Sequence, residues 1–260
     1  MDAAPKLTII ALAHNEAKHL GSCFESLKSL TEQPSVETLI VLDNRADEAT
    51  RTAAQAVADR VVTNTFVNFS TQRNFGLETA DGEWVLYIDP DERCTPELAS
   101  EIAAAMGKIE YAAYRVPRRN IFFGHEVRHT GWSPDYQVRL LRRESCRYDE
   151  SREVHEFPVV RGDTGTLKSP LIHFNYESWR QFIAKQWAYA RFDAKALYAA
   201  GITARPRNMI GQPLRELKRR VVDYRGYRDG ALGLALSAAM GLYRAEIYRQ
   251  LWLLQRREGH

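Results

Sequence analysis

Short apolar runs alternate with segments of helical spacing over the first hundred residues of the chain. In order, the apolar runs are 7–12, 38–42, 61–62 and 84–88, and the helical segments are 17–30, 48–58 and 70–80. Strands that are apolar at every position are typical of a parallel sheet that helices cover on both faces. We therefore predict an α/β fold built on a Rossmann-like sheet.

The composition excludes several classes of protein. With 260 residues, of which 45% are hydrophobic and 27% charged, the chain can bury a domain-sized core, and its net charge of +3 is too weak to indicate nucleic-acid binding. Cys23, Cys94 and Cys146 show no pairing or metal spacing, which favours a reducing cytoplasm. We expect no secretory signal, and no apolar run reaches the ~18 residues that span a bilayer.

Polar clusters follow three of the apolar runs, at the point where each run ends. They are His14-Asn15-Glu16, Asp43-Asn44-Arg45 and Asp89-Pro90-Asp91-Glu92. The carboxyl ends of parallel strands share one edge of the sheet, and ligands of such sheets bind beyond that edge. Three clusters at one edge predict a binding site there.

The cluster after residues 84–88 carries three carboxylates at the end of a buried run. Such a group of charges is costly unless something positive neutralises it. A divalent cation with a phosphate-bearing substrate does so, because hard oxygen ligands suit Mg²⁺ or Mn²⁺. The plain structural alternative is an acidic turn that starts a helix, since Asp-Pro also favours turns.

The pattern changes twice further along the chain. Residues 111–177 hold short runs between Gly, Pro and charged residues, which predicts a small antiparallel extension with acceptor-side loops. From residue 178 the spacing is helical, broken at Pro206 and continued to about Gln255. We therefore expect a catalytic domain over 1–177, with its nucleotide-sugar half at 1–110, and a helical appendage over 178–260.

Several motifs in fixed order resemble family 2 glycosyltransferases of the A-type nucleotide-sugar fold, and among them the lipopolysaccharide-core β-glucosyltransferase subgroup. The motifs are Asn15-Glu16, Asp43 with Asp47, Thr71–Leu77, Gly82–Leu86, Asp89-x-Asp91, Tyr114–Asn120, Gly131–Leu140, Val154-His155-Glu156 and Pro170–His173. The resemblance runs from Leu7 to about Ala199. The chain departs from it at Arg45, where a small residue is usual, and at Pro90.

The resemblance implies a role for each residue on the donor side. Asp91 would bind a divalent cation, and His173 would complete the shell of that metal; for a lone histidine after an apolar run, a structural role is the alternative. Asp89 would face the ribose or the waters of the metal. The remaining expected nucleotide-sugar residues are Asn15, Glu16, Asp43 for the uracil ring, and Arg73. Arg73 would meet a phosphate or support the acidic loop, unless it is an ordinary surface arginine.

The acceptor hydroxyl needs a general base, and a carboxylate is the usual one. We predict Glu156, within Val154-His155-Glu156, and keep Asp135 as the second candidate. Gly131 and Trp132 are expected on the acceptor side, where the indole would stack on a sugar or else belong to the core.

Together these features predict an inverting, metal-dependent glycosyltransferase. It would move a hexose from a UDP-sugar or another nucleotide-sugar donor to a glycan or lipid-linked acceptor of the cell envelope, such as a lipopolysaccharide core. One alternative is a nucleotidyltransferase, although that class carries a Gly-rich basic loop where this chain has Ala13-His14-Asn15-Glu16. The other is a non-catalytic nucleotide-sugar-binding protein of the same fold.

The C-terminal third predicts peripheral attachment to an anionic membrane. Residues 205–228 hold eight basic residues against Glu216 and Asp223, and the apolar positions of 231–243 suit an interfacial helix. The alternative is a helical pair that packs on the protein itself or forms a homo-oligomer, because apolar stripes are more often core.

Overall fold

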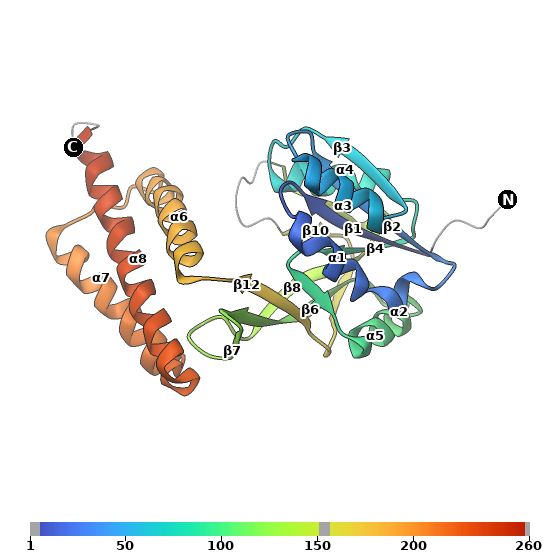
Figure 1. Cartoon of the computed structure of the whole chain (residues 1–260). Helices are drawn as coiled ribbons and strands as arrows, with labels where there is room; N and C mark the ends of the chain where they lie inside the picture. The colour runs from blue at the N-terminus through green and yellow to red at the C-terminus, as the bar shows by residue number, and fades with distance from the viewer. Residues whose placement is uncertain (1–5, 151–156, 258–260) are drawn as a thin grey trace. The chain divides into compact units, whose positions relative to one another are not determined.

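The computed structural model describes residues 6–150 and 157–257 (Figure 1). The chain forms two compact units, and each is treated on its own below. Unit 1 comprises residues 1–118 and 135–173, and unit 2 comprises residues 119–134 and 174–260. Residues 119–134 therefore group with the C-terminal helices, whereas the sequence-based boundary lies at residue 178.

Unit 1 is built on a parallel sheet. Its strands are β1 (Leu7–Ala13), β2 (Val36–Asp43), β3 (Arg60–Asn64) and β4 (Trp84–Ile88), in the spatial order β3-β2-β1-β4. All three pairings are parallel, with Ala13 opposite Leu42 and Ala11 opposite Ile88. The carboxyl ends of β1, β2 and β4 therefore meet at one edge, as predicted, and the α/β fold class is confirmed.

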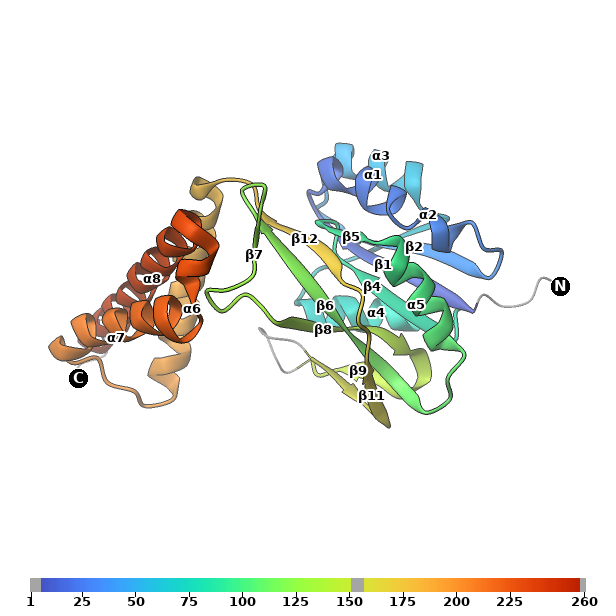
Figure 2. The same ribbon diagram turned by 90° about the horizontal axis from the view of Figure 1, so that it is seen from below.

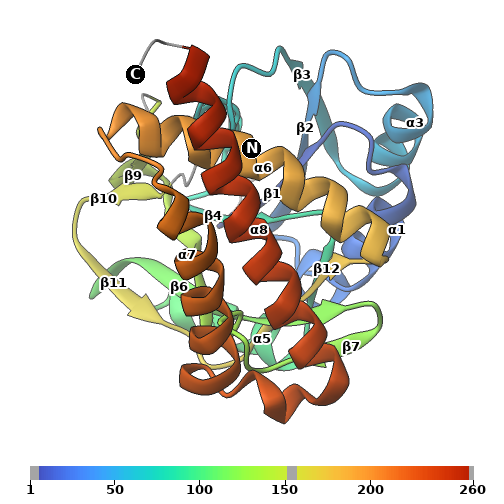
Figure 3. The same ribbon diagram turned by 90° about the vertical axis from the view of Figure 1, so that its left-hand side faces the viewer.

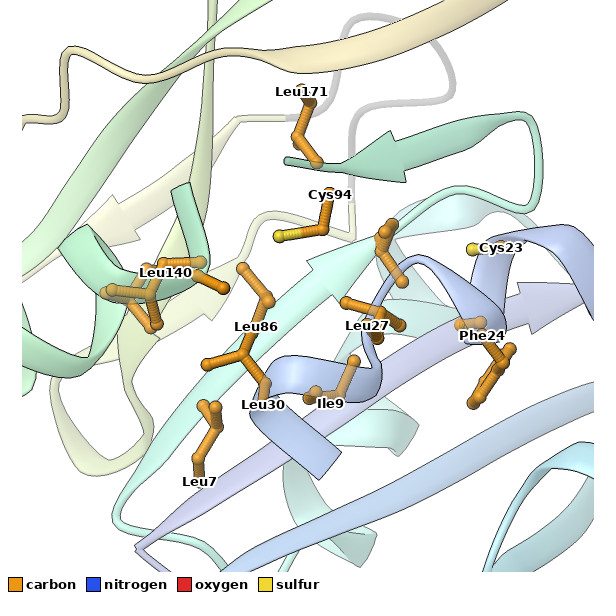
Figure 4. Packing of buried hydrophobic residues seen from close by; sticks show 14 of the residues in the cluster. Leu7, Ile9, Cys23, Phe24, Leu27, Leu30, Leu86, Cys94, Leu140 and Leu171 are labelled. Atoms are coloured by element: carbon orange, nitrogen blue, oxygen red, sulfur yellow. The ribbon is translucent and has the colours of Figure 1, made fainter. Parts of the chain in front are cut away.

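Helices cover both faces of this sheet. They are α1 (Ala17–Glu25), α2 (Lys28–Thr31), α3 (Glu48–Val57), α4 (Phe69–Thr79) and α5 (Pro96–Met106), and α1 and α3 lie side by side (Figure 2). Alternate residues of each strand enter opposite cores. Ile9 and Leu86 pack with α1, α2 and α5 (Figure 4), and Ile10 and Tyr87 pack on the α4 side.

Side-chain caps start three of these helices. Asp47 accepts from the Thr50 amide, Asn68 from the Thr71 amide, and Thr95 from the Leu98 amide. Each cap satisfies an amide that would otherwise lack a partner. The single helix predicted over 17–30 is wrong in one respect: it is divided between α1 and α2, with the chain turning at residues 26–27.

The antiparallel extension is also confirmed, although residues 163–166 within it pair in parallel with residues 111–115. It comprises β5 (Glu92–Cys94), β6 (Tyr111–Phe122), β7 (His125–Val127), β8 (Asp135–Arg142), β9 (Cys146–Tyr148), β10 (Pro158–Val160), β11 (Asp163–Thr166) and β12 (Leu171–Tyr176). β8 runs antiparallel to β4 and to β6, and β12 runs antiparallel to β5. In these registers Arg118 lies opposite Asp135 and His173 lies opposite Glu92, which brings residues of the later strands to the edge of β4.

The helices of unit 2 confirm the helical C-terminal region. They are α6 (Trp179–Ala199), α7 (Pro206–Lys218) and α8 (Gly230–Arg257), and α8 packs along both α6 and α7 (Figure 3). Pro206 occupies the first turn of α7, where its missing amide costs nothing. Among the described residues, no helix combines the length and the apolar content that crossing a bilayer requires.

Candidate active site

A pocket of about 330 Å³ opens at the carboxyl ends of β1 and β2. Its volume falls within the range of small-molecule sites. The pocket is lined by Leu12, Ala13, His14, Glu16, Asp43, Arg45, Phe66, Phe69 and Gln72. Two of the predicted nucleotide-sugar residues, Glu16 and Asp43, thus line one cavity.

Asp43, the last residue of β2, is held by Arg45. Its Oδ1 accepts from the Arg45 backbone amide at 2.9 Å and its Oδ2 accepts from Arg45 Nη2 at 2.7 Å, while His14 Nδ1 lies 3.6 Å from Oδ2. The hydrogen bonds from Arg45 lower the pKa of the Asp43 carboxyl to about 2. A hydrogen-bond acceptor that stays ionised is thus fixed in the pocket wall.

Asn15 and Glu16 shape the turn that follows β1. The Glu16 carboxylate accepts from the backbone amide of His14, and Asn15 Oδ1 accepts from the amide of Asp47 at 3.3 Å. Glu16 therefore both lines the pocket and closes its own loop. Asn15 ties that loop to the start of α3 and is not part of the pocket lining.

Two phenylalanines form an aromatic corner of the pocket that the motifs did not indicate. The rings of Phe66 and Phe69 meet edge to face with centroids 5.0 Å apart, and Phe69 is 48% exposed. A large apolar side chain this exposed beside a pocket is a ready stacking surface for a base. The available signal was two phenylalanines flanking Asn68, the cap of α4.

Asp89 lies at the end of β4 and is paired with two arginines. Arg139 donates from both Nη atoms to its carboxylate, and Arg73 Nη2 lies 3.3 Å from Oδ1. Burial alone would raise the pKa of Asp89, but the charges of Arg139 and Arg73 prevail and hold it below its ordinary value. The side chain remains 31% exposed, so part of it can still reach a ligand.

Glu92 extends this pairing into a buried network. It is fully buried, its Oε1 accepts from Arg139 Nη2 at 2.7 Å and from Arg118 Nη1 at 3.4 Å, and its Oε2 accepts from the Asp89 amide. Arg118 Nε also donates to Asp135 Oδ2 at 2.8 Å. We call Asp89, Glu92, Arg118, Asp135 and Arg139 the arginine network. Arg118 and Arg139 were not assigned from the sequence.

Asp91 is oriented differently from its neighbours. Its Oδ2 lies 3.4 Å from Nε2 of His173, which comes from β12, and the two side chains are 34% and 11% exposed. The sequence predicted these two residues as metal ligands, and the fold brings them together across strands that are far apart in sequence. Among residues 6–150 and 157–257, no cluster of three or more His, Cys, Asp or Glu side chains is suited to a metal ion.

Arg73 belongs to a buried tripeptide rather than to the helix surface. Arg73 is 8% exposed and its guanidinium lies 5.0 Å from the ring centre of Tyr87. On either side of it, Gln72 accepts from Asn64 Nδ2 at 3.0 Å, and Asn74 pairs with the backbone of Tyr148. The surface-arginine alternative is wrong, and the geometry of Arg73 is that of support for the acidic loop.

The structure describes one of the two candidate bases, Asp135. Asp135 is held on both carboxylate oxygens, because Oδ1 accepts from Gln137 Nε2 at 2.9 Å and Oδ2 from Arg118. Glu156 lies outside the described residues.

The expected acceptor-side residues lie in unit 2. Trp132 is half-buried, with its ring centroid 4.9 Å from that of Phe122, and the guanidinium of Arg220 lies 4.7 Å from its ring centre. Gly131 precedes it with φ +88°. The indole therefore belongs to an aromatic cluster and is only partly open to solvent.

A known protein family and known relatives match this chain over most of unit 1. The model of glycosyl transferase family 2 matches residues 8–158, which include Asp43, Asp89 and Asp91. The lipopolysaccharide core biosynthesis glycosyltransferase LpsC of Rhizobium meliloti (strain 1021) is 30% identical over 225 residues, which cover 80% of this chain and 78% of that protein. An uncharacterized glycosyltransferase of Rickettsia bellii (strain RML369-C) is 24% identical over 208 residues, or 75% of this chain and 69% of that one.

Among solved structures, the crystal structure of residues 1–349 of S. aureus TarS aligns over 98% of this chain and 92% of that chain. The TM-score is 0.47 and the identity 15%. The family model spans more than half of the chain, and the likeness to LpsC extends over most of both proteins. The chain is a glycosyltransferase and belongs to glycosyl transferase family 2.

Proposed function

We propose that this glycosyltransferase is inverting and metal-dependent. It moves a hexose from a UDP-linked donor to a glycan or lipid-linked acceptor of the cell envelope, such as a lipopolysaccharide core. The observation that carries this proposal is the Asp91–His173 pair, at the sheet edge that also bears the Asp43 pocket. The relative named for lipopolysaccharide core biosynthesis supports the acceptor class.

The side chains of Asp91 and His173 fit a hard divalent cation. Asp91 is one-third exposed and its Oδ2 lies 3.4 Å from an imidazole nitrogen, so its carboxylate can still reach a ligand. Mg²⁺ is typically bound through one or two carboxylates together with substrate phosphates and water. Asp91 and His173 would hold Mg²⁺ or Mn²⁺, which supplies Lewis-acid stabilisation of the departing diphosphate when it is bound.

The pocket residues suit the nucleotide. The ionised Asp43 accepts a hydrogen bond from the uracil imide, and the Phe66–Phe69 corner offers an apolar face to the ring. Glu16 lines the same cavity, and Asp89, held by Arg139 and Arg73, presents its exposed part toward the ribose.

On the acceptor side, Glu156 removes the proton of the attacking hydroxyl. A single base with in-line attack inverts the anomeric centre, so an α-linked donor gives a β-linked product. Asp135 is the weaker candidate, since both of its oxygens already accept hydrogen bonds.

Purified protein tests this function with a panel of UDP-, GDP- and CMP-sugars, with and without Mn²⁺. The expected result is a rise in melting temperature with UDP-sugars that requires Mn²⁺, followed by slow release of UDP. NMR of the product should show a β linkage. Preference for another nucleotide, or an α-linked product, would contradict the donor or the inverting mechanism respectively.

A lipid-linked acceptor calls for contact with a membrane, and we propose that the enzyme is cytoplasmic and that α7 makes this contact. The exposed stripe of α7 and the turn after it mixes apolar and basic residues at helical spacing: Arg207, Ile210, Leu214, Lys218 and Val222. Ile210 and Leu214 are 69% and 59% exposed. Such a face can lie in the interface while its cations meet anionic lipid.

The stripe differs from the one predicted over residues 231–243. In α8, Leu236 and Met240 are buried in the core of unit 2, so much of that apolar pattern is packing, as the alternative held. Flotation with anionic liposomes should recover the wild type at low salt and lose Leu214→Glu. Val67→Glu, at another exposed apolar position, is the control. A stable dimer that does not bind liposomes would contradict membrane attachment and favour a homo-oligomer.

A further inference from the structure

The segment 128–134, here called the acceptor-side loop, joins β7 to β8 and carries Gly131 and Trp132. Its backbone is unusual, because Thr130 has φ +61° and Gly131 has φ +88°. A β-branched residue in the left-handed region is strained and persists only where its surroundings hold it. Thr130 is fully buried, so the question is which residues of unit 2 hold it there.

Asp229 holds the first part of the loop. Its Oδ2 accepts from the His129 backbone amide at 2.8 Å, and its Oδ1 lies 2.8 Å from His129 Nδ1 and 3.3 Å from the Arg128 amide. The Asp229 side chain is 6% exposed. A carboxylate with this many local donors and so little solvent fixes the path of the backbone.

Arg220 holds the second part. Its Nη1 donates to the carbonyl oxygen of Thr130, and the same guanidinium lies 4.7 Å from the Trp132 ring centre. Glu216 Oε1, on α7, accepts from Arg220 Nε at 2.6 Å. This hydrogen bond orients the Arg220 side chain toward the loop. One arginine thus meets both the strained residue and the indole of the loop.

The packing around the loop leaves it little freedom. A Cβ on Gly131 would lie 2.7 Å from the ring of Tyr224, and a Cβ on Gly226 would lie 2.6 Å from Thr130 Cγ2. Asn120 Nδ2 donates to the carbonyl of Trp132 at 2.8 Å. The loop is therefore closely packed in one conformation, and residues 216–229 provide most of the contacts that hold it.

We propose that Arg220 and Asp229 are positioning residues for the acceptor site. Through them the C-terminal helical unit sets the affinity for the acceptor, while the donor site resides in unit 1. This inference rests on the proposed function and on the acceptor-side role that the family resemblance implies for Gly131 and Trp132. The ion pairs of residues 216–229 would then have a second function besides stabilising the helices.

The test compares adjacent arginines. Arg220→Ala and Arg219→Ala each remove one charge that pairs with Glu216, with one hydrogen bond lost at Arg220 and two at Arg219. Of the two arginines, Arg220 donates to the loop itself, whereas Arg219 stacks on Tyr224, whose ring packs against Gly131. With UDP-glucose and a heptose-containing core oligosaccharide as the acceptor probe, Arg220→Ala should raise the acceptor KM about tenfold or more. The donor KM and kcat should stay within about twofold, Arg220→Lys should restore part of the loss, and Arg219→Ala should raise the acceptor KM much less than Arg220→Ala does.

A second readout does not need turnover. In protein labelled with 5-fluorotryptophan, the resonance that Trp132→Phe removes should shift in Arg220→Ala and shift much less in Arg219→Ala, because Arg220 lies over the Trp132 ring. An unchanged resonance, or an acceptor KM that moves equally in both alanine variants, would overturn the positioning role. A wild type that binds UDP but does not glycosylate the probe would contradict the proposed acceptor class, whereas the fluorine shift would still decide whether Arg220 positions the loop.

Discussion

Two neighbouring carboxylates at the end of β4 lie in opposite surroundings. Glu92 is fully buried and accepts from Arg139 and Arg118, whereas Asp91 is one-third exposed and faces His173. The same edge of the sheet thus holds one acid whose charge the protein neutralises itself and one that stays partly open to solvent. The difference teaches that neighbouring residues of one acidic motif can serve different ends: Glu92 supports the structure of the site, and we propose that Asp91 binds the ligand.

The largest effect is expected at the open carboxylate. Asp91→Asn should lower turnover by about 10⁴-fold or more, because several kcal/mol of leaving-group stabilisation would depend on the cation that we propose it binds. Its melting temperature should remain near that of the wild type. Steady-state kinetics with saturating Mn²⁺ measure this, and near-native turnover in a folded variant would remove the distinction between the two carboxylates.

The candidate bases sharpen the same comparison, because Asp135 belongs to the arginine network, whereas Glu156 lies outside the described residues. Glu156→Gln should lower kcat by ~10²–10⁴, the usual contribution of a general base, without weakening donor binding. Asp135→Asn should act mainly on stability. An active Glu156→Gln together with a folded but inactive Asp135→Asn would transfer the role of base to Asp135.

Substitution of the buried carboxylate, Glu92, should lower the stability of the fold. Glu92→Gln removes the fully buried charge that Arg139 and Arg118 share and leaves them only the partly exposed Asp89 and Asp135 as partners, which costs about 3–5 kcal/mol. For a chain of this size that corresponds to a fall in melting temperature of roughly 6–20 °C. Thermal unfolding followed by circular dichroism checks this, and a melting temperature equal to that of Asp91→Asn would contradict the division of roles.

The smallest effect concerns pH. Arg45 lowers the pKa of Asp43 to about 2, so the pair contributes its full stability above the ordinary aspartate pKa and loses it as the pH falls toward 2. The difference in unfolding free energy between the wild type and Arg45→Ala should therefore be constant at neutral pH and shrink in acid. A difference that grows on acidification would show that Arg45 does not hold the Asp43 carboxylate in its ionised form.

The sheet edge could be predicted from the sequence because local patterns determine it. Residues 84–88 are apolar throughout, and β4 covers the same five residues, followed at once by the acidic motif. The meeting of His14, Asp43 and Asp89 at one edge follows from parallel strands alone. The prediction that His173 reaches Asp91 came from motif order and not from any local signal.

The arginine network could not be predicted in the same way. Arg118 and Arg139 reach Glu92 from strands 26 and 47 positions away, through antiparallel registers that no local pattern determines. One signal was present, since a charged residue within the apolar run 138–141 implies a buried partner. In the C-terminal helices, the sequence predicted an interfacial stripe over residues 231–243, and only packing shows that Leu236 and Met240 of that stripe are covered.

The most direct test of the different roles of Asp91 and Glu92 is a measurement of Mn²⁺ binding in the presence of UDP. Electron paramagnetic resonance detects the Mn²⁺ that stays free. The wild type, Asp91→Asn and Glu92→Gln are compared at a temperature where all three are folded. We predict that Asp91→Asn loses UDP-dependent Mn²⁺ binding, while Glu92→Gln keeps it despite its lower melting temperature. Mn²⁺ binding that survives in Asp91→Asn and is lost in Glu92→Gln would contradict the account.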